Sequence, residues 1–121
     1  MGLLNINTEV TRNGAALLHP VGNIDGRTFE ELECVMDDVY DRGLHQIIVD
    51  LTHVTYVSSA GIGVLIDAQC QAQEHHGHII LVNPLPCVRN VLDVLGITSV
   101  FHVVDTLDEA LAIPIPQEHP S

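Results

Sequence analysis

Two adjacent serines, Ser58 and Ser59, are the residues of this chain whose placement most clearly predicts chemistry. They follow the apolar run at 46–51 and a short loop, and they stand where a predicted helix begins. Free backbone N–H groups and the positive end of the helix dipole would stabilise a phosphate there. Ser58 as the N-cap would leave the Ser59 hydroxyl at the rim. The pattern predicts a serine switch rather than a catalyst, and simple capping is the alternative interpretation.

Gly61 and Gly63 fall in the first turns of the same predicted helix. Glycine inside a helix costs up to about 1 kcal/mol relative to alanine. Two glycines here therefore indicate close approach by a partner backbone or a need for bare surface. Tight packing of the helix on the sheet is the alternative.

The serines do not match the motifs of catalytic serines or of nucleotide sites. A nucleophile elbow, G-x-S-x-G, would need glycine at position 57, which is Val57. No spacing ties Ser59 to the histidines that follow it at His75, His76, His78 and His102. Gly61-Ile62-Gly63 lacks the third glycine of a dinucleotide fingerprint, and no G-K-[ST] is present. We expect no catalytic residue, no cofactor and no enzymatic activity.

Two clusters have metal-binding side chains but simpler interpretations. His75-His76-Gly77-His78 lies at a predicted helix-to-strand junction, where solvated polar residues are expected, with Glu74 as its nearby carboxylate. The acidic residues between Glu30 and Asp41 surround the apolar positions of a predicted helix and indicate a solvated face. Such a face could orient a partner rich in arginine or lysine. No metal site is predicted.

The charge of the chain limits its partners. A formal net charge of −12, with no lysine and four arginines, opposes binding to nucleic acid or to an anionic membrane. No apolar run approaches the roughly 20 residues that span a bilayer, and the start of the chain lacks a signal peptide pattern. Cys34, Cys70 and Cys87 are widely spaced, which predicts reduced, mostly buried thiols. We expect a cytoplasmic protein without membrane insertion.

Hydrophobic periodicity predicts one α/β domain over residues 1–113 and an extended or disordered proline-rich tail over 114–121. Arg12-Asn13-Gly14 predicts a hairpin turn between the first two strands. Strands are expected at about 3–11, 15–21, 46–51, 78–82 and 100–104, and helices at about 28–43, from 59 onward, at 88–95 and at 106–112. The order ββαβαβαβα requires a mixed sheet of about five strands, the first antiparallel and the last four parallel, packed with about four helices.

Local patterns add detail to the predicted helices. Capping boxes are expected at Thr28 with Glu31 and at Thr106 with Glu109. The buried stripe of the second helix is expected at Ile62, Leu65, Ile66 and Cys70, and that of the third at Val88, Val91, Leu92 and Leu95.

The carboxyl ends of parallel strands gather at one edge of a sheet, where α/β proteins usually keep their sites. Polar residues follow three of the predicted strands: Asn23 and Asp25, then Ser58 and Ser59, then Asn83. The serine pair is therefore expected between two polar neighbours.

The chain resembles the STAS domains, and most closely the free-standing anti-sigma factor antagonists of bacteria. The resemblance covers nearly the whole chain and rests on the order and spacing of its marks. These are Gly22-Asn23-Ile24-Asp25, Ile48 to Val54, Ser59-Ala60-Gly61-Ile62-Gly63, Leu81-Val82-Asn83-Pro84, Val91-Leu92 and Leu95-Gly96-Ile97.

The resemblance implies a function. An unphosphorylated antagonist binds an anti-sigma factor that is also a serine kinase, which frees a sigma factor, and phosphorylation of a serine at the second helix ends the complex. A serine phosphatase is the implied partner for the reverse step. The phosphoacceptor of the family falls on Ser59. The family often has aspartate directly before the acceptor, whereas this chain has Ser58 there, and Ser58 is the second candidate for phosphorylation. The implied partner-binding residues are Asn23, Asp25, Ser58, Ser59, Ala60, Gly61, Ile62, Gly63 and Asn83. The alternative function is that of a non-catalytic STAS scaffold or accessory subunit of a stress-signalling assembly or a membrane transporter.

Overall fold

Regular elements follow one another closely in the computed structural model, which describes residues 4–114. In chain order they are β1 (Leu4–Val10), β2 (Ala16–Ile24), α1 (Phe29–Asp41), β3 (Ile47–Asp50), β4 (Val54–Val57), α2 (Ser59–Glu74), β5 (Ile79–Val82), α3 (Pro86–Val94), β6 (His102–Val104) and α4 (Leu107–Leu111). The proline-rich tail predicted over 114–121 lies, except for Pro114, outside the described residues.

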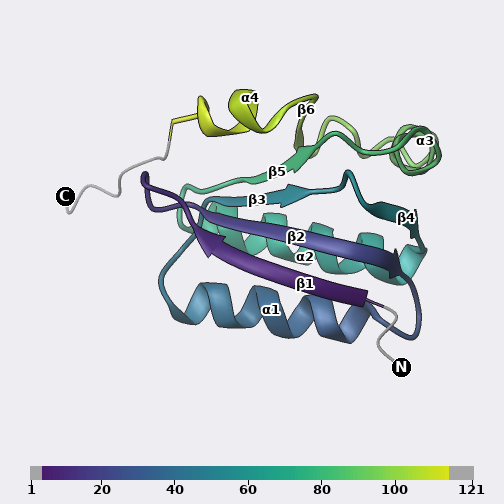
Figure 1. Ribbon diagram of the computed structural model, residues 1–121, viewed down its shortest axis with the longest axis horizontal. Coiled ribbons are helices and arrows are strands. Elements are labelled where there is room, and N and C mark those ends of the chain that lie inside the picture. The colour runs from purple at the N-terminus through teal and green to yellow at the C-terminus, as the bar shows by residue number, and fades with distance from the viewer. Residues whose placement is uncertain (1–3, 115–121) are drawn as a thin grey trace.

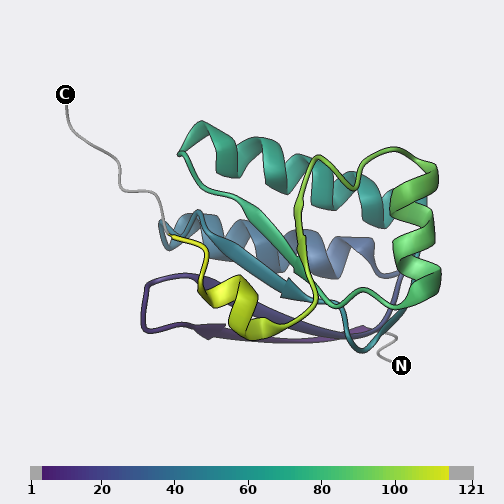
Figure 2. The ribbon, with the colours of Figure 1, turned by 90° about the horizontal axis from the view of Figure 1, so that it is seen from above.

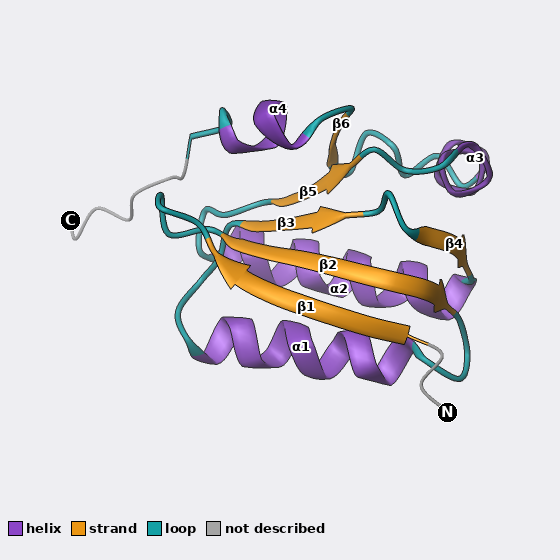
Figure 3. Ribbon diagram, viewed as in Figure 1, coloured by secondary structure: helices purple, strands orange, loops and turns teal. Residues whose placement is uncertain are grey.

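The sheet has the strand order β1-β2-β3-β5-β6 (Figures 1 and 3). The strands β1 and β2 form an antiparallel hairpin, and every other pairing is parallel. These findings confirm the predicted mixed sheet with its antiparallel first pair. They also confirm four helices among the described residues.

The sheet has a sixth strand, β4, in a segment where the sequence predicted a loop. The predicted number of about five strands was therefore one too low. The strand β2 is nine residues long, whereas β3 has four and pairs only with Ala16–Leu18. The far end of β2 is therefore free to pair with Val54–Val57, and a bulge shifts the register between Gly22 and Asn23. This extra pairing brings the end of β2 directly beside the start of α2.

The helices cover the two faces of the sheet unequally. Figures 1 and 2 show α1 and α2 on one face, the short α4 on the other, and α3 at the end of the sheet near β4. Alternation along β3 matches this arrangement: Ile47 and Val49 join the large core with α1 and α2, whereas Ile48 joins the smaller core with α4. No helix among residues 4–114 is both long and apolar enough to cross a membrane.

The buried face of α2 differs from the predicted stripe. Ile62 and Leu65 are buried as expected, but Cys70 is exposed and the face continues through Ala68, Gln69 and Ala72. Alanine lets the helix lie close to the strands, and the amide oxygen of Gln69 accepts a hydrogen bond from Ile79 N at 2.8 Å. The expectation of mostly buried thiols is wrong, because all three cysteines are free and exposed, Cys34 and Cys87 included.

Candidate functional site

The start of α2 is held by Ser58 and presents Ser59. Ser58 is the N-cap in an extended conformation, and its hydroxyl oxygen accepts a hydrogen bond from Gly61 N at 3.4 Å. The backbone N–H of Ser58 donates to the carbonyl oxygen of Ile24 at 2.8 Å, which fixes the helix start to the end of β2. Ser59 is the first helical residue and is exposed. The predicted cap at Ser58, with the hydroxyl of Ser59 at the rim, is confirmed.

The two glycines of α2 have different environments. A Cβ atom on Gly61 would lie 2.6 Å from Ile24 Cγ2 and 2.9 Å from the Ile24 carbonyl oxygen, closer than side chains normally approach. A Cβ atom on Gly63 would meet nothing within 4 Å, and Gly63 is exposed. Tight helix-to-sheet packing therefore explains Gly61, whereas Gly63 leaves bare surface one turn beyond Ser59.

Asn23 lies inside β2, one residue before its end, and not after the strand as predicted, because β2 extends to Ile24. Asp25 directly follows β2, and Thr28 organises the turn from there into α1. The buried hydroxyl of Thr28 donates to the carbonyl oxygen of Asn23 at 2.7 Å and accepts from Asp25 N at 2.9 Å. The predicted capping box of Thr28 with Glu31 is wrong, because this hydroxyl bonds the loop rather than the helix N–H groups. The box at Thr106 is confirmed in part, since its hydroxyl accepts from Glu109 N at 3.2 Å.

Asn23 also connects the end of β2 to β4. Its side-chain oxygen accepts a hydrogen bond from the hydroxyl of Thr55, and its backbone pairs opposite Tyr56. Because β4 leads directly into Ser58, the loop and the helix start form one continuous edge. The structure thus brings Asn23 and Asp25 to the same end of the sheet as Ser58 through Gly63 (Figure 3).

Asn83 follows β5 in a left-handed backbone conformation, with φ of 49°. Its side-chain amide donates to Thr52 Oγ1 at 3.2 Å, and that hydroxyl donates to Asp50 Oδ1 at 2.6 Å. The other carboxylate oxygen of Asp50 lies 3.3 Å from His19 Nδ1. Asn83 is therefore part of a polar network that centres on Asp50, and no hydrogen bond found among residues 4–114 joins it to the serines.

The pKa of Asp50 reflects this network. Burial alone would raise the pKa of the carboxyl group, but the hydrogen bonds from Thr52 and the proximity of His19 outweigh burial and hold the pKa below its usual range. Asp50 therefore carries its negative charge at neutral pH, and it anchors the loop between β3 and β4.

A groove beside the serines was not predicted from the sequence. Its volume is about 290 Å³, and its lining includes Tyr56 and Val94 together with Ser58 and Ser59. Leu95, which was predicted on the buried stripe of the third helix, also lines the groove and is 53% exposed. The last turn of α3 thus leaves apolar side chains uncovered, and no pattern in the sequence distinguishes them from the buried apolar residues of the same helix.

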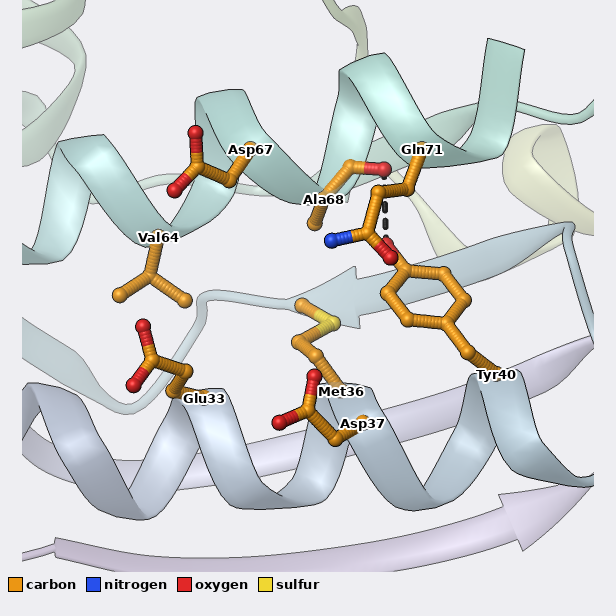
Figure 4. A pocket seen from close by; sticks show the side chains of 8 residues that line it. All are labelled: Glu33, Met36, Asp37, Tyr40, Val64, Asp67, Ala68 and Gln71. Atoms are coloured by element: carbon orange, nitrogen blue, oxygen red, sulfur yellow. Dashed lines mark hydrogen bonds between the residues drawn. The ribbon is translucent and has the colours of Figure 1, made fainter. Parts of the chain in front are cut away.

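A second, smaller cavity of about 180 Å³ lies between α1 and α2 (Figure 4). Carboxylates of Glu33, Asp37 and Asp67 line it, and the hydroxyl of Tyr40 donates to the carbonyl oxygen of Ala68 at 2.7 Å. Burial, followed by the charges of Asp37 and Asp67, raises the pKa of the Tyr40 hydroxyl. Within the described part of the chain, no three histidine, cysteine or acidic side chains are grouped so that they could hold a metal ion.

The histidines that follow Ser59 lie far from it. His75 caps the other end of α2, whose 16 residues span roughly 24 Å. Its ring stacks on that of His45 with centroids 3.9 Å apart. His78 and His102 precede or begin β5 and β6 and meet edge to face at 4.7 Å. None of these rings is placed to accept a proton from the Ser59 hydroxyl.

The fold defines a small α/β domain. At one end of its mixed sheet, a helix capped by Ser58 presents the exposed Ser59. The chain belongs to the STAS domain family, whose family model matches residues 5–110. It is 30% identical over 91 residues to BtrV of Bordetella bronchiseptica, a candidate anti-sigma factor antagonist. The aligned region covers 75% of this chain and 78% of BtrV.

Several solved structures share the fold. An anti-sigma factor antagonist from Mycobacterium paratuberculosis superposes with a TM-score of 0.81 at 23% identity, covering 89% of this chain and 91% of that one. The Bacillus cell fate determinant SpoIIAA, solved in its phosphorylated form, superposes with a TM-score of 0.71 at 20% identity, covering 88% of this chain and 96% of that one.

Proposed function

We propose that this chain is an anti-sigma factor antagonist controlled by phosphorylation of Ser59. Unphosphorylated, it binds an anti-sigma factor with serine kinase activity, which releases a sigma factor in the cytoplasm. Phosphorylation of Ser59 by that kinase dissociates the complex. A serine phosphatase removes the phosphate and restores the form that binds the anti-sigma factor. The observation that carries the proposal is the exposed Ser59 hydroxyl at the first helical position of α2, next to the capping Ser58.

The comparisons support the class of partner. Curated relatives of the chain, BtrV among them, are named as anti-sigma factor antagonists. SpoIIAA shows that a protein of this fold exists in a phosphorylated form. The proposed partner-binding surface comprises Asn23, Asp25, Ser58, Ser59, Ala60, Gly61, Ile62 and Gly63, with Asn83 at its margin.

Ser59 is a better phosphoacceptor than Ser58 for a structural reason. The hydroxyl of Ser58 already serves α2 as its cap, and the residue is half-buried. Phosphorylation of Ser58 would therefore disturb the helix start, at a cost of about 1 kcal/mol for the lost cap. Ser59 is exposed and makes no comparable demand on the fold.

A phosphate on Ser59 would change the interface far more than the fold. It adds a charge of about −1.5 to −2, which the free N–H groups and dipole of the helix start accommodate. A partner surface pressed against Ser59 would instead have to desolvate a dianion, on a chain whose net charge is already −12. A penalty of about 4 kcal/mol corresponds to a loss of roughly a thousandfold in affinity.

The test uses ATP and the cognate anti-sigma factor kinase with the purified chain. We expect one phosphate per chain by intact mass, located on Ser59 by fragmentation of the peptide. Ser59→Ala should abolish phosphorylation, whereas Ser58→Ala, a matched control, should retain it. Retention of the phosphate in Ser59→Ala would show that the assignment is wrong.

A second measurement tests the electrostatic mechanism. Ser59→Asp should bind the unmodified anti-sigma factor far more weakly than wild type, because it places a charge at the same point of the interface. Ser59→Asn has a similar size without the charge and should bind nearly as well as wild type. Equal affinities of Ser59→Asp and Ser59→Asn would remove charge as the cause of dissociation.

A further inference from the structure

The groove beside Ser59 has an exposed lining that is mainly apolar. Tyr56 is 51% exposed, Leu95 53% and Val94 76%. These side chains come from two elements, since Tyr56 lies on β4 and the other two lie at the end of α3. Figures 1 and 2 show these elements beside one another at one end of the sheet. Clustered apolar side chains rimmed by polar ones are typical of a protein interaction site.

We propose that this groove receives an apolar side chain of the anti-sigma factor, which anchors the partner over Ser59. The inference rests on the proposed function and names the chemistry of the partner at the same site. It assigns Tyr56, Val94 and Leu95 to the docking surface, beyond the serine-bearing edge itself.

Continuity with the phosphoacceptor identifies the occupant. Ser58 and Ser59 form part of the wall of the groove, so a partner that reaches the Ser59 hydroxyl covers the groove as well. Val91 and the ring of Tyr56 supply apolar lining, while the polar lining consists of the two serines and Asn90. None of these side chains carries a charge, which favours an aliphatic or aromatic anchor over a charged one.

A second copy of the chain is the less favourable occupant. Two identical chains would each bring a net charge of −12 to the contact, and their mutual repulsion opposes association. The residues from 4 to 114 do not fill the groove either, because Val94 and Leu95 remain exposed within that part of the chain.

The groove also explains why phosphorylation at its wall would act so strongly. An apolar side chain seated beside Ser59 excludes water from the hydroxyl. A phosphate there would either lose its hydration in the complex or force the anchor out of the groove. The anchor and the phosphate thus compete for the same space.

The test compares two substitutions that add the same charge. Val94→Glu places a carboxylate on the groove, and Val10→Glu places one on an exposed valine of β1, 53% exposed, which lies outside the groove lining. Dissociation constants are measured with the purified anti-sigma factor kinase and ADP, which prevents phosphorylation. We expect Val94→Glu to weaken binding about 30-fold or more and Val10→Glu to change it less than about threefold.

Tyr56→Ala serves as a second variant, with an expected loss of about tenfold or more and no added charge. Melting temperatures of all variants are recorded, and these exposed positions should leave the fold intact. Unchanged affinity in Val94→Glu and Tyr56→Ala, with wild-type binding intact, would overturn the groove proposal alone. Equal loss in Val94→Glu and Val10→Glu would overturn it too, since charge rather than the groove would then be the cause. Failure of the wild-type chain to bind any anti-sigma factor would refute the proposed function, and the groove proposal with it.

Discussion

Replacing Gly61 or Gly63 by alanine should change the stability of the fold in opposite directions. Both residues lie in α2, where alanine gains up to about 1 kcal/mol over glycine in helix propensity. At Gly63 the added methyl group meets no atom within 4 Å, so the gain is unopposed. We expect Gly63→Ala to raise the free energy of unfolding by about 0.5–1 kcal/mol.

At Gly61 the same methyl group meets the end of β2. Its position would lie 2.6 Å from a methyl group of Ile24, which can rotate, and 2.9 Å from the Ile24 carbonyl oxygen, which cannot. That oxygen accepts the hydrogen bond from Ser58 N at 2.8 Å, so relief of the clash strains the anchor of α2. Overpacking of this kind costs about 1–3 kcal/mol. After the helix gain, Gly61→Ala should lower stability by about 1–2 kcal/mol.

Urea unfolding of the two variants, followed by far-ultraviolet circular dichroism, measures both effects, because the chain has no tryptophan for fluorescence. The m-value should stay constant while the midpoint moves down for Gly61→Ala and up for Gly63→Ala. Thermal melts should separate the two variants by roughly 8 °C, at about 4 °C per kcal/mol. A Gly61→Ala variant as stable as wild type would refute the packing explanation, and a destabilised Gly63→Ala variant would refute the open surface at that position.

Two further predictions concern a histidine and a buried hydroxyl. Burial, followed by the charge of His102, lowers the pKa of His78 below its usual 6.5. The unfolded chain therefore binds a proton at His78 more readily than the folded chain does, and the free energy of unfolding falls as the pH drops below about 7. His78→Gln should reduce that fall in urea unfolding compared between about pH 7.5 and pH 5.5, and an unchanged slope would contradict it. Thr28→Val should cost about 1–3 kcal/mol, because the carbonyl of Asn23 and the N–H of Asp25 lose their partner. Faster amide hydrogen exchange at Asp25 is the measurement, and unchanged exchange would show that the hydroxyl does not hold the loop.

The parts of the fold that local patterns encode were predictable from the sequence. Arg12-Asn13-Gly14 indicated the hairpin, and apolar stripes with a period near 3.6 indicated the helices. The strand β4 was missed because Val54–Val57 has four residues and no clean alternation. Its pairing with β2 is possible because β2 extends beyond the end of β3. This difference in length becomes apparent only in the assembled sheet.

The same distinction applies to the site. The cap at Ser58 was predictable, because capping involves only the next three residues. The role of Thr28 was not, since its hydroxyl could bond either its own helix or the preceding loop, and only the position of Asn23 decides between them. Leu95 has the correct spacing for a buried stripe, yet it follows the last residue of α3 and lines the open groove beside β4, which leaves it exposed.

The start of α2 is fixed from two sides, and this determines how a signal at Ser59 can act. The backbone of Ser58 is bonded to β2, and Gly61 lies against Ile24 so closely that no side chain fits between them. A helix start that is held this firmly cannot respond to a phosphate by rotating or moving away. The added charge must then act outward, on whatever surface covers Ser59 and the apolar groove beside it. Phosphorylation of Ser59 should therefore leave the melting temperature within about 2 °C of the unmodified chain, while binding to the anti-sigma factor is lost. A large shift in melting temperature would show that the switch works through the fold instead.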